Sequence, residues 1–164
     1  MQPFMKQLFI IVAFALFCTT GFAQPQIGTK APDISLPDAN GQIIKLSSLQ
    51  GKVVILDFWA SWCGPCRRSN RTVISPLYSK YKDQGLEVFA VSIDGSKQDW
   101  SSAVKQDNMN WLQVIDTKAA RGNELTQTWN LQYIPSTFVI DKTGKIVAIS
   151  PEKDYYEKLL KRLL

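Results

Sequence analysis

Residues 53–66 read VVILDFWASWCGPC, and this stretch decides the fold. Apolar side chains occupy both alternating faces of residues 53–59, which is typical of a β-strand buried on both sides of a sheet. Cys63 and Cys66 follow directly, and the segment after them has helical spacing. Two thiols three positions apart at the start of a helix share one turn, so they can close a small disulfide ring without moving the chain. The stretch therefore predicts a redox-active cysteine pair.

The helix expected after Cys66 has one apolar face but also contains a proline. Apolar residues recur at intervals of three and four, at Val73, Ile74, Leu77, Tyr78 and Tyr81. Pro76 has no backbone donor and its ring clashes with the preceding turn. The sequence predicts that the helix kinks at Pro76, or that it stops and restarts with Ser75 as its cap and Pro76 in the first position.

The remaining segments alternate between strand and helix patterns. Two short apolar pieces flank the turn dipeptide Asn40-Gly41 and predict a small β-hairpin within residues 34–45. Further strands are expected at residues 86–93, 111–115, 132–140 and 145–149. Helices are expected after a capping box at residues 96–99, around Leu125 and Trp129, and after Asp154 as the terminal cap. This order predicts an α/β sandwich with a mixed sheet.

The first 23 residues have the features of a secretory signal peptide. Lys6 precedes an apolar stretch at residues 8–18 that is too short to cross a bilayer as a helix, and small residues flank a cleavage point at residues 21–23. We expect cleavage after Ala23, which leaves residues 24–164 as one domain. Lipidation of Cys18 and an uncleaved membrane anchor are the alternatives, and all three readings place the protein outside the cytoplasmic membrane, in the periplasm.

The composition is that of one globular domain. Hydrophobic residues make up 45% of the chain and charged residues 20%, which excludes a disordered chain and a membrane bundle. The net charge of +5 is too scattered to predict a nucleic-acid partner. The chain has no histidine, and without Cys18 only Cys63 and Cys66 remain, which is too few ligands for a zinc site. A purely structural disulfide is disfavoured because the ring closes so short a loop.

Two motifs, DFWASWCGPC at residues 57–66 and YIPSTF at residues 133–138, resemble those of the thioredoxin superfamily. The likeness is closer to its exported TlpA/ResA-like branch, which is related to the AhpC/TSA proteins, and it extends through residues 28–33, 88–94 and 140–145. The resemblance implies a thioredoxin-like fold, with a central mixed β-sheet flanked by helices and an N-terminal β-hairpin extension. It also implies no cofactor beyond the redox-active disulfide of Cys63 and Cys66.

Three residues carry the expected catalysis. Cys63 is the expected nucleophile, because unpaired N–H groups and the dipole at a helix start favour its thiolate. Cys66, one turn inside the helix, is expected to be more buried and to act as the resolving thiol. Asp57 stands within the buried strand, where its pKa should rise. The resemblance implies that Asp57 takes the proton of Cys66 through a water molecule.

Five further residues are expected to contact the substrate. The resemblance makes Pro135 a cis-proline packed against the disulfide, where the backbone of Ile134 can pair with an extended substrate segment. Trp62 is a candidate contact surface beside the nucleophile. Gly64 lets a partner approach closely, and Pro65 stiffens the first helical turn.

Other positions are expected to be structural, or depart from the family pattern. Trp59 is expected in the core, and Arg67 and Arg68 are better explained as solvated helix residues than as substrate-docking residues. Many TlpA/ResA-like proteins have an acid and a proline shortly after the second cysteine, where this chain reads Ser-Asn-Arg at residues 69–71. Ala90 stands where thioredoxin has a lysine beside the buried acid.

The function that we expect is reduction of disulfides in exported proteins, with a membrane thiol electron donor as the source of electrons. The Gly-Pro pair between the cysteines resembles that of reducing thioredoxins. Apocytochrome c, and hence cytochrome c biogenesis, is a candidate client, and we expect a monomer. The alternatives are a disulfide oxidase or isomerase, a thiol peroxidase with antioxidant activity, and a non-catalytic binding module. A peroxidase is disfavoured because Ala60 stands where peroxiredoxins have Thr or Ser three residues before the reactive cysteine.

Overall fold

A five-stranded mixed sheet forms the centre of the computed structural model, which describes residues 25–164. The strand order is β5-β4-β3-β6-β7. β3 (Val53–Trp59) lies in the middle, parallel to β4 (Leu86–Ser92) and antiparallel to β6 (Ser136–Ile140). β5 (Leu112–Ile115) and β7 (Ile146–Ile149) form the edges. All seven residues of β3 are buried, as its unbroken apolar pattern predicts.

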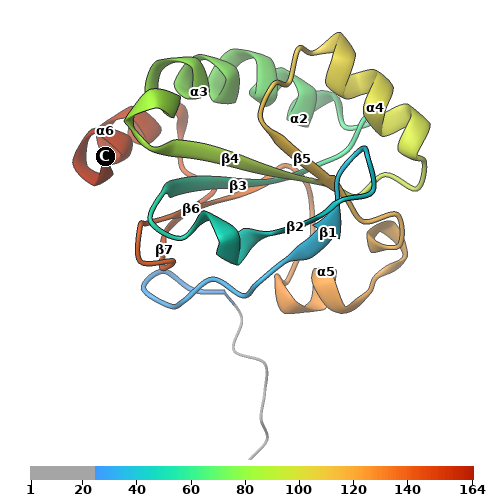
Figure 1. Ribbon diagram of the computed structural model, residues 1–164, viewed down its shortest axis with the longest axis horizontal. Coiled ribbons are helices and arrows are strands. Elements are labelled where there is room, and N and C mark those ends of the chain that lie inside the picture. Colours follow the sequence, from blue (N-terminus) through green and yellow to red (C-terminus); the bar gives the residue numbers. More distant parts are fainter. Residues whose placement is uncertain (1–24) are drawn as a thin grey trace, which may run out of the picture.

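Helices cover both faces of this sheet (Figure 1). One face packs against α2 (Gly64–Ser69), α3 (Ser75–Tyr81), α4 (Lys97–Gln106) and α6 (Lys153–Leu163). The other face is covered by α5 (Glu124–Thr128), the 3₁₀ turn η1 (Leu46–Leu49), and the hairpin of β1 (Ser35–Pro37) and β2 (Ile43–Lys45). Further 3₁₀ turns are η3 (Lys82–Gln84) and η4 (Ala119–Arg121). The thioredoxin-like sandwich and the N-terminal hairpin are confirmed.

The two cores follow from the alternation of side chains along β3. Val53, Ile55 and Trp59 face the α2–α3 side, whereas Leu56 and Phe58 face the hairpin side. On the hairpin side Phe58 packs with Trp129 and Phe138, with ring centroids 4.9 to 6.1 Å apart. Trp59 is fully buried, so its expected place in the core is confirmed.

The long helix after the cysteines continues through a π-helical turn, η2 (Asn70–Ile74), that joins α2 to α3. The Ser75 N–H bonds to the carbonyl oxygen of Asn70, five residues back, and Ser75 has helical dihedrals of −58° and −48°. The predicted restart with Ser75 as a cap is therefore wrong. Pro76 has no backbone N–H to donate to the preceding helical turn, and the π-helical turn before it accommodates the proline without ending the helix.

Helix and strand ends agree with the sequence in most places, but the strand expected at residues 132–140 begins only at Ser136. Ser96 caps α4 by accepting the Asp99 N–H at 3.2 Å, as predicted. The terminal helix differs, because Glu152 occupies the capping position and Asp154 lies in the first turn. Within residues 25–164 no helix is long and apolar enough to cross a membrane. The predicted signal peptide at residues 1–23 and Cys18 lie outside the described residues.

Candidate active site

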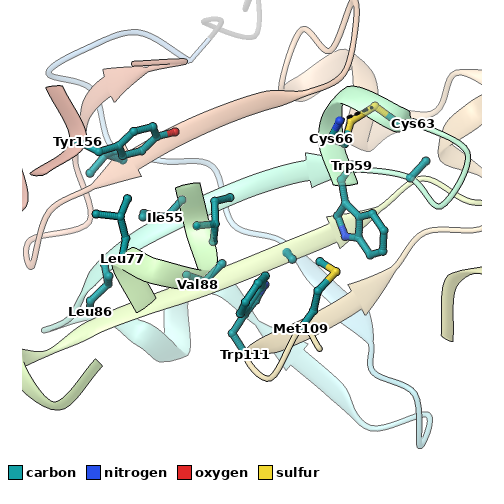
Figure 2. Close-up of a cluster of buried hydrophobic side chains, with 14 of the residues drawn as sticks. Ile55, Trp59, Cys63, Cys66, Leu77, Leu86, Val88, Met109, Trp111 and Tyr156 are labelled. Carbon is teal, nitrogen blue, oxygen red and sulfur yellow. Dashed lines mark hydrogen bonds between the residues drawn. A yellow bond between two sulfur atoms is a disulfide. The ribbon is translucent and has the colours of Figure 1, made fainter. Parts of the chain in front are cut away.

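The cysteine pair lies where β3 ends and α2 begins. Cys63 and Cys66 form a disulfide with an S–S distance of 2.01 Å. Cys63 occupies the capping position of α2, and its Sγ accepts the backbone N–H of Cys66 at 3.2 Å. Pro65 lies in the first helical turn, where a missing N–H leaves no bond unmade. Figure 2 shows the disulfide at the helix start, above Trp59.

The two cysteines differ in exposure. Cys63 is 6% exposed and Cys66 is 1% exposed, and Gly64 and Pro65 between them are exposed. A partner that approaches this turn therefore meets Cys63 before Cys66. The order agrees with the predicted roles of attacking and resolving thiol. The open surface over Gly64, with no atom near the place of an added Cβ, agrees with its predicted contact role.

Asp57 lies on the same face of β3 as the cysteines. Its cross-strand neighbours are Ala90 on β4 and Thr137 on β6, so alanine does stand beside the acid. The residue is 2% exposed, and burial raises its pKa from 3.8 to about 7. The side-chain amide of Asn70 acts in the opposite direction and lowers the pKa, although Asp57 Oδ2 itself has no hydrogen-bond partner. A group with this pKa exchanges a proton near neutral pH.

Tyr156 from α6 reaches the same region of the sheet. Its hydroxyl lies 2.8 Å from Thr137 Oγ1. Thr137 is the residue that stands opposite Asp57 in the pairing of β3 with β6. Burial raises the pKa of Tyr156 to about 12, and the charge of Asp57 acts in the same direction. Tyr156 therefore stays neutral while Asp57 titrates.

A buried carboxylate holds the loop that leads to Cys63. Asp94 is 2% exposed and accepts the Ser61 N–H at 2.9 Å, the Ser61 hydroxyl at 2.7 Å and the Ser92 hydroxyl at 2.7 Å. These bonds satisfy a charge that would otherwise be costly to bury. No role was predicted for Asp94 from the sequence. An acid that closely follows a buried strand, here β4, is the signal that could have identified it.

An apolar groove runs between Trp62, which directly precedes Cys63, and the residues before Pro135. The Ile134–Pro135 peptide is cis, as the resemblance implies. Trp62 and Tyr133 are 65% and 69% exposed and line the groove together with Ile134. Its other walls are Ile93, Ala119, Ala120, Gly122, Thr126, Leu131 and Gln132. The structure thus brings Trp62 and Ile134 together at one surface, and it adds Tyr133, which the sequence analysis did not single out for this role.

Arg67 is not a solvated helix residue, which corrects the sequence-based interpretation. Its Nε and Nη2 contact the two oxygens of Asp107 at 2.7 and 3.0 Å, and Nη2 also reaches Gln106. Arg71 adds a contact of 2.7 Å to the same carboxylate. These bonds hold the pKa of Asp107 below its usual range, against the effect of burial. They fasten the active-site helix to the end of α4, whereas Arg68 is exposed.

The described residues offer no group of three or more His, Cys, Asp or Glu side chains that could hold a metal ion. The redox-active groups at this site are the sulfurs of Cys63 and Cys66, and Asp57 is the nearby acid. A dithiol can exchange with a disulfide without any added group.

Comparison with known proteins agrees with this geometry. A model of the Redoxin family matches residues 26–163. The thiol-disulfide oxidoreductase ResA of Bacillus cereus is 36% identical over 122 residues, which cover 74% of this chain and 68% of the relative. The ResA of Bacillus thuringiensis subsp. konkukian is 34% identical over 141 residues, which cover 84% of this chain and 79% of the relative.

Solved structures show the same architecture. The thioredoxin domain of a thiol-disulfide oxidoreductase from Bacteroides vulgatus has a TM-score of 0.76 at 28% identity, covering 85% of this chain and 99% of the domain. A thiol-disulfide oxidoreductase from Bacteroides fragilis has a TM-score of 0.75 at 29% identity, covering 83% and 100%. The chain belongs to the Redoxin family and is a TlpA/ResA-like thiol-disulfide oxidoreductase of the thioredoxin superfamily.

Proposed function

We propose that the protein is a periplasmic reductase that returns disulfides of exported proteins to thiols. The observation that carries the proposal is the arrangement of the cysteine pair. Cys63 stands toward the surface at a helix start, beside an apolar groove, while Cys66 lies buried on the face of Asp57. In this arrangement a mixed disulfide can form between the substrate and Cys63, and the buried Cys66 thiol can then attack it.

In the first step the Cys63 thiolate attacks one sulfur of a substrate disulfide. The substrate S–S bond breaks, a new S–S bond forms to Cys63, and the second substrate sulfur leaves with the electron pair. In the disulfide form the Cys66 N–H donates to Cys63 Sγ, and in the reduced form the same donor would stabilise the attacking thiolate.

In the second step Cys66 releases its proton and attacks Cys63 Sγ. We assign the proton to Asp57, whose pKa of about 7 suits a base that works near neutral pH. The Cys63–Cys66 disulfide forms and the substrate leaves as a thiol, so the protein gives up two electrons and the substrate gains two. A membrane thiol donor would then reduce the disulfide again.

The groove supports an extended protein segment as the substrate. Trp62 and Tyr133 offer large apolar surfaces, and the backbone before Pro135 can pair with a strand. An unfolded exported chain, such as an apocytochrome c, presents a cysteine in this form. The peroxidase alternative has less support, because Ala60 is fully buried and brings no hydroxyl group to the cysteine.

Trapping tests the reductase mechanism. Cys66→Ser leaves Cys63 without its resolving partner, so mixed disulfides with client proteins should accumulate in the periplasm. The double variant Cys63→Ser/Cys66→Ser is the matched control and should trap nothing. A lack of adducts in the single variant would contradict the proposed order of attack.

The redox potential tests the direction of electron flow. A reductase should have a potential close to that of thioredoxin, about −270 mV, whereas the strong oxidant DsbA lies at about −120 mV. Equilibration with glutathione or dithiothreitol and quantification of thiols gives the value. A potential near that of DsbA, together with isomerisation of scrambled disulfides, would favour the oxidase or isomerase alternative.

A further inference from the structure

A row of four residues crosses the sheet beneath the active-site helix. Thr137, Asp57, Ala90 and Gln113 stand opposite one another on β6, β3, β4 and β5. Thr137 bonds to Tyr156, but Asp57 Oδ2 and both amide atoms of Gln113 are buried without a hydrogen-bond partner. Buried polar atoms of this kind are uncommon in folded proteins, so each calls for a physical reason.

Asn70 enters this region from the helix above. It stands four residues after Cys66, so both side chains lie on the same helical face, and its backbone N–H bonds to the Cys66 carbonyl oxygen. The side chain is 1% exposed. Nδ2 contacts Met109 Sδ at 4.0 Å, which is a weak acceptor, and Oδ1 has no partner. The amide therefore has both donor and acceptor capacity left for Asp57.

The two unpartnered oxygens, Asp57 Oδ2 and Asn70 Oδ1, are both acceptors. A protonated Asp57 carboxyl can donate a hydrogen bond, and donation to Asn70 Oδ1 would satisfy both atoms. When the carboxyl is ionised, the same amide can donate from Nδ2 instead. An asparagine thus has a hydrogen bond to offer to each protonation state of the acid.

We propose that Asn70 is a positioning residue for the proton of Asp57: its amide holds the carboxyl in both protonation states during resolution by Cys66. The inference deepens the proposed function and rests on the proposed role of Asp57. In this proposal Asn70 is the hydrogen-bond donor to Asp57. The neighbouring strand β4 cannot supply one from its side chain, because Ala90 has no polar group. The turn η2, which begins at Asn70, lies at the point where this amide enters the core.

The other groups that face Asp57 do not replace the amide. Ala90 and Thr137 from the neighbouring strands are neutral, and the Thr137 hydroxyl is engaged with Tyr156 from α6. Tyr156 keeps its proton throughout the neutral range. Cys66 is the thiol whose proton is transferred. Burial raises the pKa of Asp57, and the side-chain amide of Asn70 acts in the opposite direction.

The direct test is the titration of Asp57 by NMR, with aspartate labelled at the carboxyl carbon in the oxidised protein. Asn70→Leu keeps the volume but removes the amide, so the charged form loses a hydrogen bond. The Asp57 midpoint should rise by about one pH unit, as expected for one hydrogen bond to a charged group. Asn70→Ala serves as a second variant that adds no bulk and should raise the midpoint in the same way.

Met109→Leu is the matched control, because it removes the other contact of the Asn70 amide while keeping the apolar packing. It should leave the Asp57 midpoint where it is in the unmodified protein. A midpoint that stays unchanged in both Asn70 variants, or that moves equally in Met109→Leu, would overturn the inference.

A kinetic measurement separates this inference from the proposed role of Asp57. Single-turnover release of a peptide thiol is followed across pH in the unmodified protein, in Asn70→Leu, and in both after Asp57→Asn. The pH profile should move upward with Asn70→Leu, and this shift should vanish in the Asp57→Asn background. A profile unaffected by Asp57→Asn would reject the role of Asp57 as proton acceptor, and with it the kinetic part played by Asn70. The NMR midpoint still decides whether the amide holds the carboxyl.

Discussion

Replacing Asp57 with Asn should remove a pH dependence of stability that this one buried carboxyl imposes. In the folded protein its pKa is raised by burial from 3.8 to about 7. In the unfolded chain it returns to about 4. The folded state therefore binds the proton more tightly, so this group favours folding most at low pH. The benefit is lost as the pH rises from about 4 through about 7.

The magnitude follows from the two pKa values. Each pKa unit of difference corresponds to about 1.4 kcal/mol, so the free energy of unfolding falls by about 4 kcal/mol in total across the titration. Between pH 5 and pH 8 the loss is about 2.5 kcal/mol by the same relation. Asn at position 57 carries no charge in either state, so the variant should show no such loss.

Urea unfolding of the oxidised proteins at pH 5 and pH 8 measures this difference. The disulfide removes the thiols of Cys63 and Cys66 from the titration, and the chain has no histidine. Ordinary carboxyl groups are already ionised above pH 5, and groups common to both proteins cancel in the comparison. The reasoning would be refuted by an unmodified protein that loses no more stability than Asp57→Asn between the two pH values.

Three other predictions concern the parts of the site around the cysteines. Asp107→Asn should lower the free energy of unfolding by about 2 kcal/mol in urea, because a buried carboxylate loses its charge-assisted hydrogen bonds from the partly exposed Arg67 and Arg71. Glu157→Gln, at an exposed ion pair, should leave the urea midpoint unchanged. Tyr133→Ser should lower kcat/KM about fivefold for an unfolded protein disulfide but not for a small disulfide, as expected for a peripheral aromatic contact. Asp94→Asn should speed hydrogen exchange of the Ser61 backbone amide about tenfold, since its hydrogen bond to a charged group is lost. An unchanged exchange rate would show that Asp94 does not stabilise this loop.

The central strand and the cysteine turn were predictable because their signals are local. An apolar run without alternation can satisfy its backbone only between two other strands, and β3 is buried along its whole length. The thiols three residues apart gave a one-turn ring, as observed. The burial of Asp57 followed from its place within the run. Each inference needed only neighbours within about one turn or one strand.

Contacts between distant segments were missed for the opposite reason. Arg67 and Asp107 are separated by 40 residues, and nothing near either residue distinguishes this pair from two solvated charges. Ser61 and Asp94 are separated by 33 residues in the same way. Such pairs depend on how two helices or two loops meet, which the local pattern does not contain.

The π-helical turn was missed because the prediction considered only two outcomes at a helix proline. A kink and a restart both assume that the preceding turn keeps its α register. The Ser75 N–H instead bonds five residues back, and the helix continues. The first residue of this turn is Asn70, which is buried. Its burial could not be predicted from the sequence, because asparagine is normally exposed or caps a helix.

Asp57 lowers the stability of the folded protein above neutral pH, which indicates that it is present for proton transfer and not for folding. An apolar residue at this position would fold more favourably above pH 7, so the acid does not serve stability. It lies instead on the face of the sheet that carries Cys66, which must lose a proton to act, and Asn70 follows Cys66 by one helical turn. Cys63 and Tyr133 lie on the side where we propose that the substrate binds. Changes at Asn70 should therefore alter the pH profile of resolution without weakening substrate binding, whereas changes at Tyr133 should do the reverse.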